Sequence, residues 1–351
     1  MRASFREYGI RKITEGIRSL NPRLTQQLIE HAVSAGAHLA IIVGPQQLEQ
    51  LAEQAPGQFK GQFERLYSEE CKDLQTAVYV GVYGYDEDFA YHKKQPQGVG
   101  ATGVHQNYLK LSNDIGKDLL QFLEKRGFAG YGTGEGMLPV KYILNRVGVG
   151  KYGKNSLIYV DNCGSYINNW FELFTNAPLK PTHAPVAEGS EALSACEKCN
   201  ACIVRCPTQA IVEPYTVVMS RCITHLTHRA TFIPQELRGK ISNWIWGCNA
   251  CQNVCPVNAR VIPRKKHAEA QIHHPGPTGL PPAHKHPFPK LAGELDPSYD
   301  QTYLQNVLIA LGNTGTANDV FAIDRFYRTP KGLELKEHCD YALKRIKERH
   351  A

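Results

Sequence analysis

Four cysteines lie within eleven residues of one another in this 351-residue sequence. The run ACEKCNACIVRCPTQAI, at 195–211, has the spacing C-x2-C-x2-C-x3-C-P. Thiolates are soft ligands, and four of them hold either a zinc ion or the irons of a [4Fe-4S] cluster. In this spacing the fourth cysteine binds a different cluster from the first three, so the run predicts a second metal site. The four cysteines are Cys196, Cys199, Cys202 and Cys206.

A second run, WGCNACQNVCPVN at 246–258, repeats the end of that spacing, and one further cysteine lies between the two runs. We therefore predict two [4Fe-4S] clusters with exchanged ligands. A zinc site is the alternative, but zinc does not require this spacing. Two adjacent clusters form a relay for single electrons. The predicted ligands are Cys196, Cys199, Cys202 and Cys255 for cluster 1, and Cys206, Cys222, Cys248 and Cys251 for cluster 2.

Composition favours a globular protein of the cytoplasm. Hydrophobic residues make up 42% and charged residues 21% of the chain, and no apolar run approaches the roughly 18 residues of a membrane span. The N-terminus shows no secretory signal, so the eleven cysteines favour metal binding over disulfides. The three cysteines outside the ligand sets, Cys71, Cys163 and Cys339, are expected to be small buried apolar residues.

Positive charge is concentrated late in the chain. The formal net charge is +7, and basic residues cluster at 260–267, 325–331 and 343–350. Such clusters suit a polyanion such as RNA, although they can equally form an ordinary solvated surface.

The elements that would position the cysteines form an α/β region before them. Residues 24–44 predict a helix followed by a buried strand, 74–85 a second strand, and 108–128 an amphipathic helix that ends at Gly127. We assign residues 1–185 to an α/β domain and residues 186–262 to a ferredoxin-like domain.

The rest of the chain changes character twice. Residues 263–300 are rich in Pro and His, which predicts a linker or surface wrap rather than a metal-binding His tract. Residues 301–351 predict a helical hairpin whose first helix ends at Gly312 and whose second begins near Ala317. This hairpin is similar to one short HEAT-like repeat, which would pack against the other domains.

Several segments together resemble the epoxyqueuosine reductases. They are LPVKYILNRVGVGKYGKNSLIYVDNCGSY (138–166), SRCITHLTH (220–228) and IPQELRGKISNWIWGCNACQNVCPVN (233–258), in the family's order with both cysteine runs and the helical tail. The resemblance covers most of the chain. It implies an N-terminal α/β domain that binds cobalamin, a ferredoxin-like domain with two [4Fe-4S] clusters, and a helical segment that helps bind tRNA.

The resemblance also implies a reaction. These enzymes remove the epoxide oxygen of epoxyqueuosine at the wobble position of tRNA, in a two-electron reduction that gives queuosine. Electrons would pass through the clusters to reduce the cobalt of cobalamin, while the protein positions the substrate and supplies a proton. A cytoplasmic monomer with tRNA as substrate, a low-potential electron donor as partner and no membrane association is expected.

Cofactor contacts are carried over residue by residue. RVGVGKYGKNS matches the family's Gly-rich stretch, and DFAYHKK resembles its Asp-Tyr-His-Lys segment. The alternatives are a tight strand-turn-helix or a phosphate-binding loop for the glycines, and a structural role for the histidine. The residues implied to contact cobalamin are Tyr91, His92, Arg146, Gly148, Gly150, Gly153, Lys154 and Asn155.

The chain departs from the family pattern where the catalytic acid is expected. The family has an Asp shortly before the arginine of the Gly-rich stretch, whereas GYGTGEGMLPVK (130–141) contains none. Glu135 is the nearby carboxylate and Tyr131 another proton donor; Val257 also replaces a usual Trp. Two alternative functions follow: an iron-sulfur electron donor that activates a corrinoid protein, and a reductive dehalogenase-like enzyme with Tyr131 as its acid.

Overall fold

The structure is a computed structural model that describes residues 20–67, 73–85, 99–103, 109–134, 136–183, 186–263 and 290–351. Its contacts divide the chain into two compact units. Unit 1 comprises Met1–Val80, Ile115–Pro139 and Phe171–Val186, and unit 2 comprises Gly81–Asp114, Val140–Trp170 and Ala187–Ala351. The predicted domain boundary at residue 185 lies next to Val186, the last residue of unit 1. Residues 81–114 and 140–170, however, belong to unit 2, because their contacts are made with residues distant in sequence.

A four-stranded sheet has the strand order β1-β2-β7-β4. The predicted strands at 37–44 and 74–85 are confirmed as β1 (Leu39–Val43) and β2 (Thr76–Tyr83). Every residue of β2 is buried, as expected for an inner strand covered on both faces. The other two strands, β7 (Ile167–Thr175) and β4 (Gly130–Thr133), are antiparallel to each other.

The helices of the described residues that accompany this sheet are α1 (Pro22–Ser34), α2 (Pro45–Glu53), α3 (Gly57–Phe63) and α5 (Leu109–Glu124). The predicted helix at 108–128 is thus confirmed, and Gly127 follows it with φ +79°. That left-handed conformation favours glycine and lets the Phe128 amide donate to the Leu123 carbonyl at 3.1 Å. Helix α5 approaches β7 closely, since a Cβ at Gly116 would lie 2.1 Å from the Phe171 ring.

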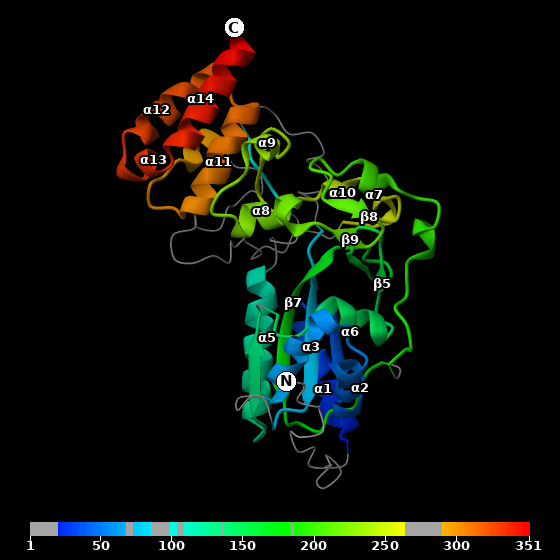
Figure 1. The fold of residues 1–351 in the computed structure, drawn as a ribbon. Helices are drawn as coiled ribbons and strands as arrows, with labels where there is room; N and C mark the ends of the chain where they lie inside the picture. The colour runs from blue at the N-terminus through cyan, green and yellow to red at the C-terminus, as the bar shows by residue number, and fades with distance from the viewer. Residues whose placement is uncertain are drawn as a thin grey trace, which may run out of the picture. The chain divides into compact units, whose positions relative to one another are not determined.

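The cysteine-rich part of unit 2 is built from short elements (Figure 1). Short helices and two-stranded sheets are typical of a region in which metal ligation replaces a large apolar core. In chain order they are α6 (Val140–Arg146), β5 (Lys151–Tyr152), β6 (Ile158–Tyr159), η3 (Ser194–Cys196), α7 (Ala201–Val204), β8 (Ile211–Glu213), β9 (Thr216–Val217), η4 (Met219–Arg221), α8 (Ile223–Arg229), α9 (Gln235–Arg238), β10 (Trp244–Trp246), α10 (Ala250–Asn253) and η5 (Asn258–Arg260).

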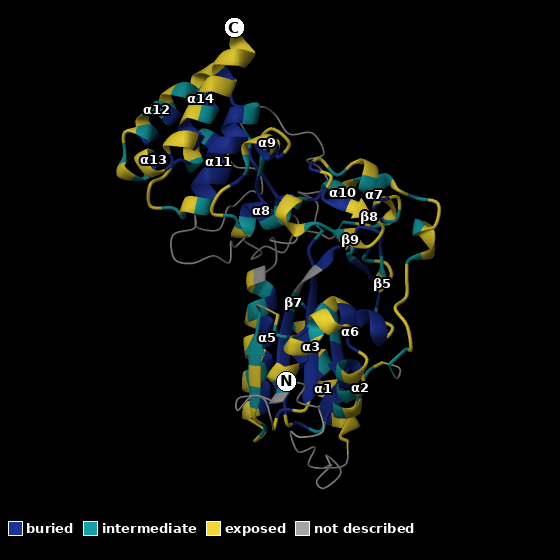
Figure 2. Cartoon of the chain, in the orientation of Figure 1, coloured by how far each residue is buried: buried dark blue, intermediate teal, exposed yellow. Residues whose placement is uncertain are grey.

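The C-terminal segment is helical, as predicted, and α11 is its buried centre (Figure 2). Residues 303–312 of α11 are all buried. The side chain of Asn306 donates to the carbonyls of Thr227 at 2.8 Å and Ile245 at 3.0 Å, which joins α11 to α8 and β10 within unit 2. The elements are η6 (Leu291–Glu294), α11 (Gln301–Thr314), η7 (Ala317–Asp319), α12 (Val320–Tyr327), α13 (Pro330–Glu334) and α14 (Lys336–His350).

The expected hairpin differs from this segment in detail. Helix α11 continues two residues beyond Gly312. The expected second helix is divided, because the Thr329 hydroxyl accepts from the Gly332 amide and Pro330 begins a new helix. Most of the Pro- and His-rich stretch at 263–300 lies outside the described residues. No helix in the described part of the chain is long and apolar enough to cross a membrane.

Candidate iron-sulfur and acid sites

The charges of the thiols link the cysteines into two overlapping groups, with Cys202 affecting both. Burial raises the pKa of Cys202, and the charges of Cys196 and Cys255 raise it further. Cys255 comes from the second run, so cysteines distant in sequence approach each other here. This is the grouping expected for cluster 1, although the ligand set itself stays a prediction.

The second group is centred on Cys248 and Cys251. Burial raises the pKa of Cys251 to about 12, followed by the charges of Cys222, Cys202 and Cys206. Burial likewise raises the pKa of Cys248, which also feels Cys251, Cys222 and Cys206. Both residues keep some exposed surface, but protein atoms crowd around their sulfurs. These thiols would bind metal only after losing protons, and a cationic centre would remove their mutual repulsion.

Backbone amides point at the sulfurs of the second group. The Ala210 amide donates to Cys206 Sγ at 3.2 Å, and the Ala250 amide donates to Cys248 Sγ at 3.4 Å. No three His, Cys, Asp or Glu side chains of the described residues converge around a point as they would around one ion. A [4Fe-4S] cluster needs a wider arrangement, because each thiolate binds a different iron.

The Gly-rich turn, predicted to contact cobalamin, lies beside the cysteine loops. Lys154 donates to the Glu197 carbonyl at 3.2 Å and to Asn200 Oδ1 at 2.9 Å, so it braces the first cysteine run. Asn155 Nδ2 donates to the Tyr159 hydroxyl at 3.1 Å, and that hydroxyl donates to Cys255 Sγ at 3.3 Å. Burial first, and then the bond to Cys255, raises the pKa of Tyr159, so the phenol stays protonated.

The other predicted cobalamin contacts on this turn are also engaged within the chain. The buried Arg146 donates through Nε to the Ala187 carbonyl at 2.7 Å. A Cβ at Gly150 would lie 2.5 Å from Ile158, and one at Gly153 would lie 2.4 Å from the Tyr159 ring, so close packing accounts for both glycines. Gly148 has φ +77° and open space around it.

The hydrogen bonds within the Gly-rich turn limit which of its groups could contact a corrin. With the side chains of Arg146, Lys154 and Asn155 used internally, a corrin would meet backbone groups such as those of Gly148. A cobalamin pocket at these residues stays a prediction. Tyr91 and His92 lie outside the described residues.

Of the two predicted proton donors, the structure describes Tyr131, while Glu135 lies outside the described residues. Tyr131 is on β4, paired with Phe174 of β7, and its side chain is 42% exposed. Its phenol can therefore reach a ligand without a change of fold.

A buried carboxylate that the sequence analysis missed holds the segment after Glu135. Glu172, on β7, is 1% exposed, and its Oε2 accepts the amides of Met137 and Leu138. Burial raises the pKa of Glu172 to about 7, against the lowering effect of these bonds. Among the described residues, Glu172 Oε1 and the hydroxyl of the nearby Tyr79 have no hydrogen-bond partner. The sequence signal was a lone carboxylate within the apolar strand WFELF.

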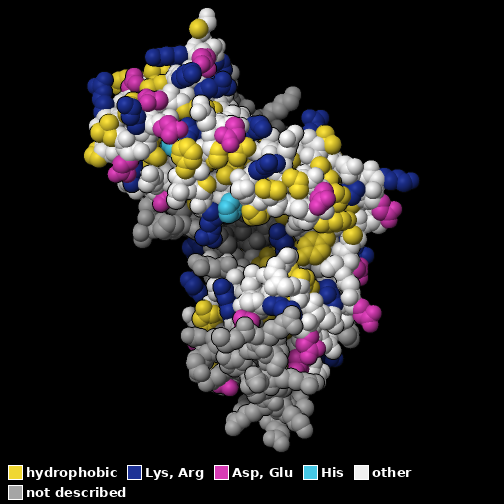
Figure 3. All heavy atoms as spheres, viewed as in Figure 1, with side chains coloured by type: hydrophobic (Ala, Val, Ile, Leu, Met, Phe, Trp, Pro, Cys, Tyr) yellow, Lys and Arg dark blue, Asp and Glu magenta, His cyan; other side chains and the backbone are white. Residues whose placement is uncertain are grey.

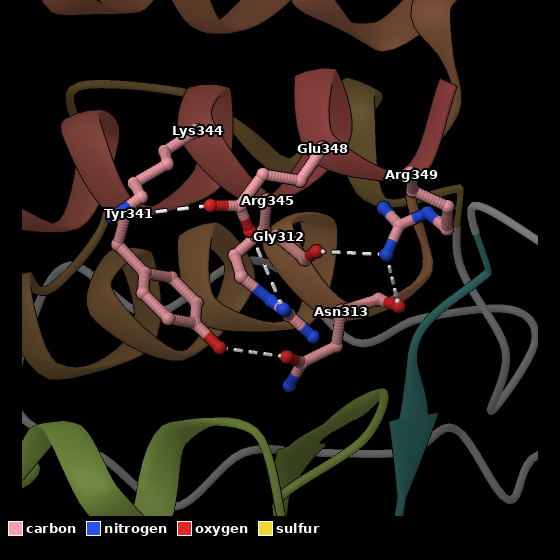
Figure 4. Close-up of polar contacts among 7 residues, drawn as sticks. All are labelled: Gly312, Asn313, Tyr341, Lys344, Arg345, Glu348 and Arg349. Atoms are coloured by element: carbon pink, nitrogen blue, oxygen red, sulfur yellow. Dashed lines mark hydrogen bonds and ion pairs between the residues drawn. The ribbon is translucent and has the colours of Figure 1, made fainter. Parts of the chain in front are cut away.

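The basic C-terminal stretch has partly structural roles (Figure 4). Arg349 donates to the carbonyls of Gly312, Asn313 and Gly315, which end α11. Lys344 and Arg345 both pair with Glu348. On the face drawn in Figure 3, Lys and Arg side chains are interspersed with Asp and Glu over these helices. The stretch is therefore not a purely cationic surface.

The remaining cysteines differ in their surroundings. Cys339 is fully buried in the helical core, as predicted, whereas Cys163 is half-buried in a turn. Cys71 lies outside the described residues.

Comparison with known proteins gives consistent results. Residues 195–258 match the 4Fe-4S double cluster binding domain. The epoxyqueuosine reductase of Salmonella typhimurium is 33% identical over 288 residues, which cover 79% of this chain and 67% of that protein. The one from Shewanella oneidensis is 37% identical over 213 residues, which cover 57% and 51%. The match thus spans about half the length of the latter protein.

Solved structures share the fold. An epoxyqueuosine reductase crystallised with an epoxyqueuosine-modified tyrosine tRNA stem loop has a TM-score of 0.69 at 21% identity, covering 92% of this chain and 90% of that one. The Streptococcus thermophilus enzyme has a TM-score of 0.68 at 20% identity, with the same coverage.

Proposed function

This chain belongs to the epoxyqueuosine reductase family, and we propose that it is an iron-sulfur oxidoreductase that reduces the epoxide of epoxyqueuosine in tRNA to queuosine. The observation that carries this proposal is the match of residues 195–258 to a double-cluster domain, within which cysteines of the two runs lie close enough to raise one another's pKa. The approach of Cys255 to Cys202 supports the exchanged ligand sets. Two adjacent clusters suit the delivery of two single electrons to one substrate.

Cobalamin is proposed as the third redox group, on the basis of family membership. When bound, it would supply a strongly reducing cobalt centre for opening the epoxide. The protein's part is to hold the acid segment and to donate a proton to the departing oxygen. Tyr131 and Glu135 are the proposed donors, and Glu172 fixes the backbone of Met137 and Leu138 beside them.

Substrate binding is proposed to involve the HEAT-like helices. Arg325 on α12, Arg328 directly after it and Lys336 on α14 are exposed, so they can contact RNA phosphates. Such contacts would position the tRNA without reading its sequence.

The proposal is tested with anaerobically reconstituted protein. Iron, sulfide and cobalt contents are measured first. The protein is then incubated with epoxyqueuosine-containing tRNA and a strong reductant, and the nucleosides are analysed by mass spectrometry. We expect queuosine, one oxygen atom lighter than the substrate nucleoside. An intact epoxide in the presence of both clusters and cobalamin would contradict the proposal.

A second candidate is an electron donor that reduces the cobalt of a separate corrinoid protein. The observation that favours it is that Arg146, Lys154 and Asn155 already donate to groups within the chain rather than serving only a corrin. Cobalt content discriminates between the two, because an electron donor purifies with iron and sulfide but without stoichiometric cobalt.

A further inference from the structure

One cysteine sulfur accepts a hydrogen bond from a buried phenol. The Tyr159 hydroxyl donates to Cys255 Sγ at 3.3 Å, and both residues are less than 10% exposed. In the other group, Cys206 and Cys248 accept from backbone amides, and the Thr208 hydroxyl lies 3.8 Å from Cys206 Sγ. Cys251 of that group also accepts from the Asn155 side chain, and backbone amides donate to Cys202 of the first group, so it is the phenol that sets Cys255 apart.

Asn155 fixes the direction of the phenol proton. Its Oδ1 accepts the Leu157 amide at 3.3 Å, which identifies the other amide atom as Nδ2. That nitrogen donates to the Tyr159 oxygen at 3.1 Å. The Ser165 side chain also hydrogen-bonds the Tyr159 hydroxyl and, like Asn155, lowers its pKa, as a donor to the oxygen does. With its oxygen accepting from both, the phenol uses its one proton for Cys255 Sγ.

The glycine-rich turn holds the Tyr159 ring in place. A Cβ at Gly153 would lie 2.4 Å from that ring, and a Cβ at Gly150 would lie 2.9 Å from the Tyr159 carbonyl oxygen. The Tyr159 ring therefore occupies the space that a side chain at Gly153 would need, and the Tyr159 backbone lies against Gly150. A hydrogen bond held rigidly in a buried site is stronger than one exposed to water.

Hydrogen bonds to cluster sulfurs help to set the reduction potential. Such a bond stabilises the reduced form more than the oxidised form, because reduction adds negative charge at the sulfurs. We propose that the Tyr159 hydroxyl, oriented by Asn155, raises the reduction potential of cluster 1 and so sets the direction of electron flow between the two clusters. This inference rests on the proposed ligand sets.

The test is a redox titration of anaerobic protein, followed by electron paramagnetic resonance without substrate. Tyr159→Phe removes only the hydroxyl, so we expect the potential of one cluster to fall and that of the other to stay unchanged. Asn155→Ala removes the donor that orients the phenol and also the side chain bonded to Cys251, so it should lower the potential of cluster 1 by less and change that of cluster 2 as well. Repeating both titrations in a Cys222→Ala background, in which cluster 1 alone is expected, identifies the cluster that responds.

Tyr166→Phe is the matched control. Tyr166 is also buried, stacks on Tyr85 at 4.4 Å, and its pKa is raised by burial, by Tyr85 and Tyr83, and then by Cys255 and Cys251. No hydrogen bond joins it to a sulfur among the described residues. Its variant should keep both potentials.

Two results would overturn the inference: unchanged potentials in Tyr159→Phe with both clusters present, or an equal fall in Tyr166→Phe. If Tyr159→Phe does not retain its clusters, an unchanged potential of cluster 1 when Asn155→Ala is made in the Cys222→Ala background overturns the inference instead. A parent protein without iron and sulfide would contradict the proposed function itself. The iron and sulfide contents are therefore measured before any titration begins.

Discussion

At the scale of single residues, Cys255 can distinguish two arrangements of the clusters. In one, the two cysteine runs exchange ligands; in the other, each run holds its own metal site. Its pKa effect on Cys202 places it with the first run, although it lies in the second. We expect Cys255→Ala to lose about half of the iron, from the same cluster that Cys196→Ala affects. The double variant Cys196→Ala/Cys255→Ala should lose little more, whereas Cys222→Ala/Cys255→Ala should lose nearly all. Iron analysis with electron paramagnetic resonance measures this, and the opposite pattern of double variants would exclude the exchange.

Glu172 predicts a pH dependence of stability. Its pKa rises from 4.5 to about 7 in the folded protein, so between these values the folded state binds more protons than the unfolded state. Stability from this group is therefore highest below pH 4.5 and falls until about pH 7, by roughly 3 kcal/mol. Glu172→Gln keeps an acceptor for the Met137 and Leu138 amides but removes the charge.

We expect Glu172→Gln to unfold at a higher temperature than the parent at pH 8 and to lose most of the slope between pH 5 and 7. Thermal unfolding at several pH values measures both effects. Glu188→Gln, on an exposed carboxylate, should retain the parent's slope. If the unfolding temperature of Glu172→Gln changes with pH as steeply as that of the parent, another group is responsible for the pH dependence.

At the scale of elements, the contact between α5 and β7 depends on Gly116. Because a Cβ there would lie 2.1 Å from the Phe171 ring, we expect Gly116→Ala to cost about 1–3 kcal/mol through overpacking. Gly61→Ala is the control, since no atom lies within 4 Å of a Cβ at that position in α3. It should be neutral or stabilise by about 0.5–1 kcal/mol. Denaturant unfolding compares the two, and equal effects would argue against the close contact.

Local patterns in the sequence were enough to predict β1, β2, α5 and the helical C-terminus, because apolar periodicity and capping residues act over short distances. The position of β7 between β2 and β4 was not predictable in this way, since pairing joins residues far apart. The Glu172 contact and the bond from Tyr159 to Cys255 were missed for the same reason. Within the candidate site, the cysteine spacing indicated the cluster ligands. It carried no information about the side chains and amides that hydrogen-bond their sulfurs.

At the scale of the whole molecule, binding of tRNA should depend on salt. Arg325 and Arg328 lie one turn apart on or next to α12, and both are exposed. If they contact phosphates, each alanine variant should weaken binding and reduce the slope of log affinity against log salt by about one. Lys117→Ala, on α5, removes an exposed charge elsewhere and should leave the slope unchanged. Filter binding at several salt concentrations measures the slopes, and equal slopes for all variants would place the tRNA elsewhere.

The strand order has a consequence for how the protein is made. Strand β7 lies between β2 and β4 in the sheet, yet it is the last of the four to be synthesised. A ribosome that has finished β2 at Tyr83 must add residues 84–166 before β7 begins to emerge. During that interval β2, whose residues are all buried in the finished protein, has one unpaired edge. Until β7 pairs with it, this edge of β2 is a site at which the nascent chain can aggregate or bind a chaperone.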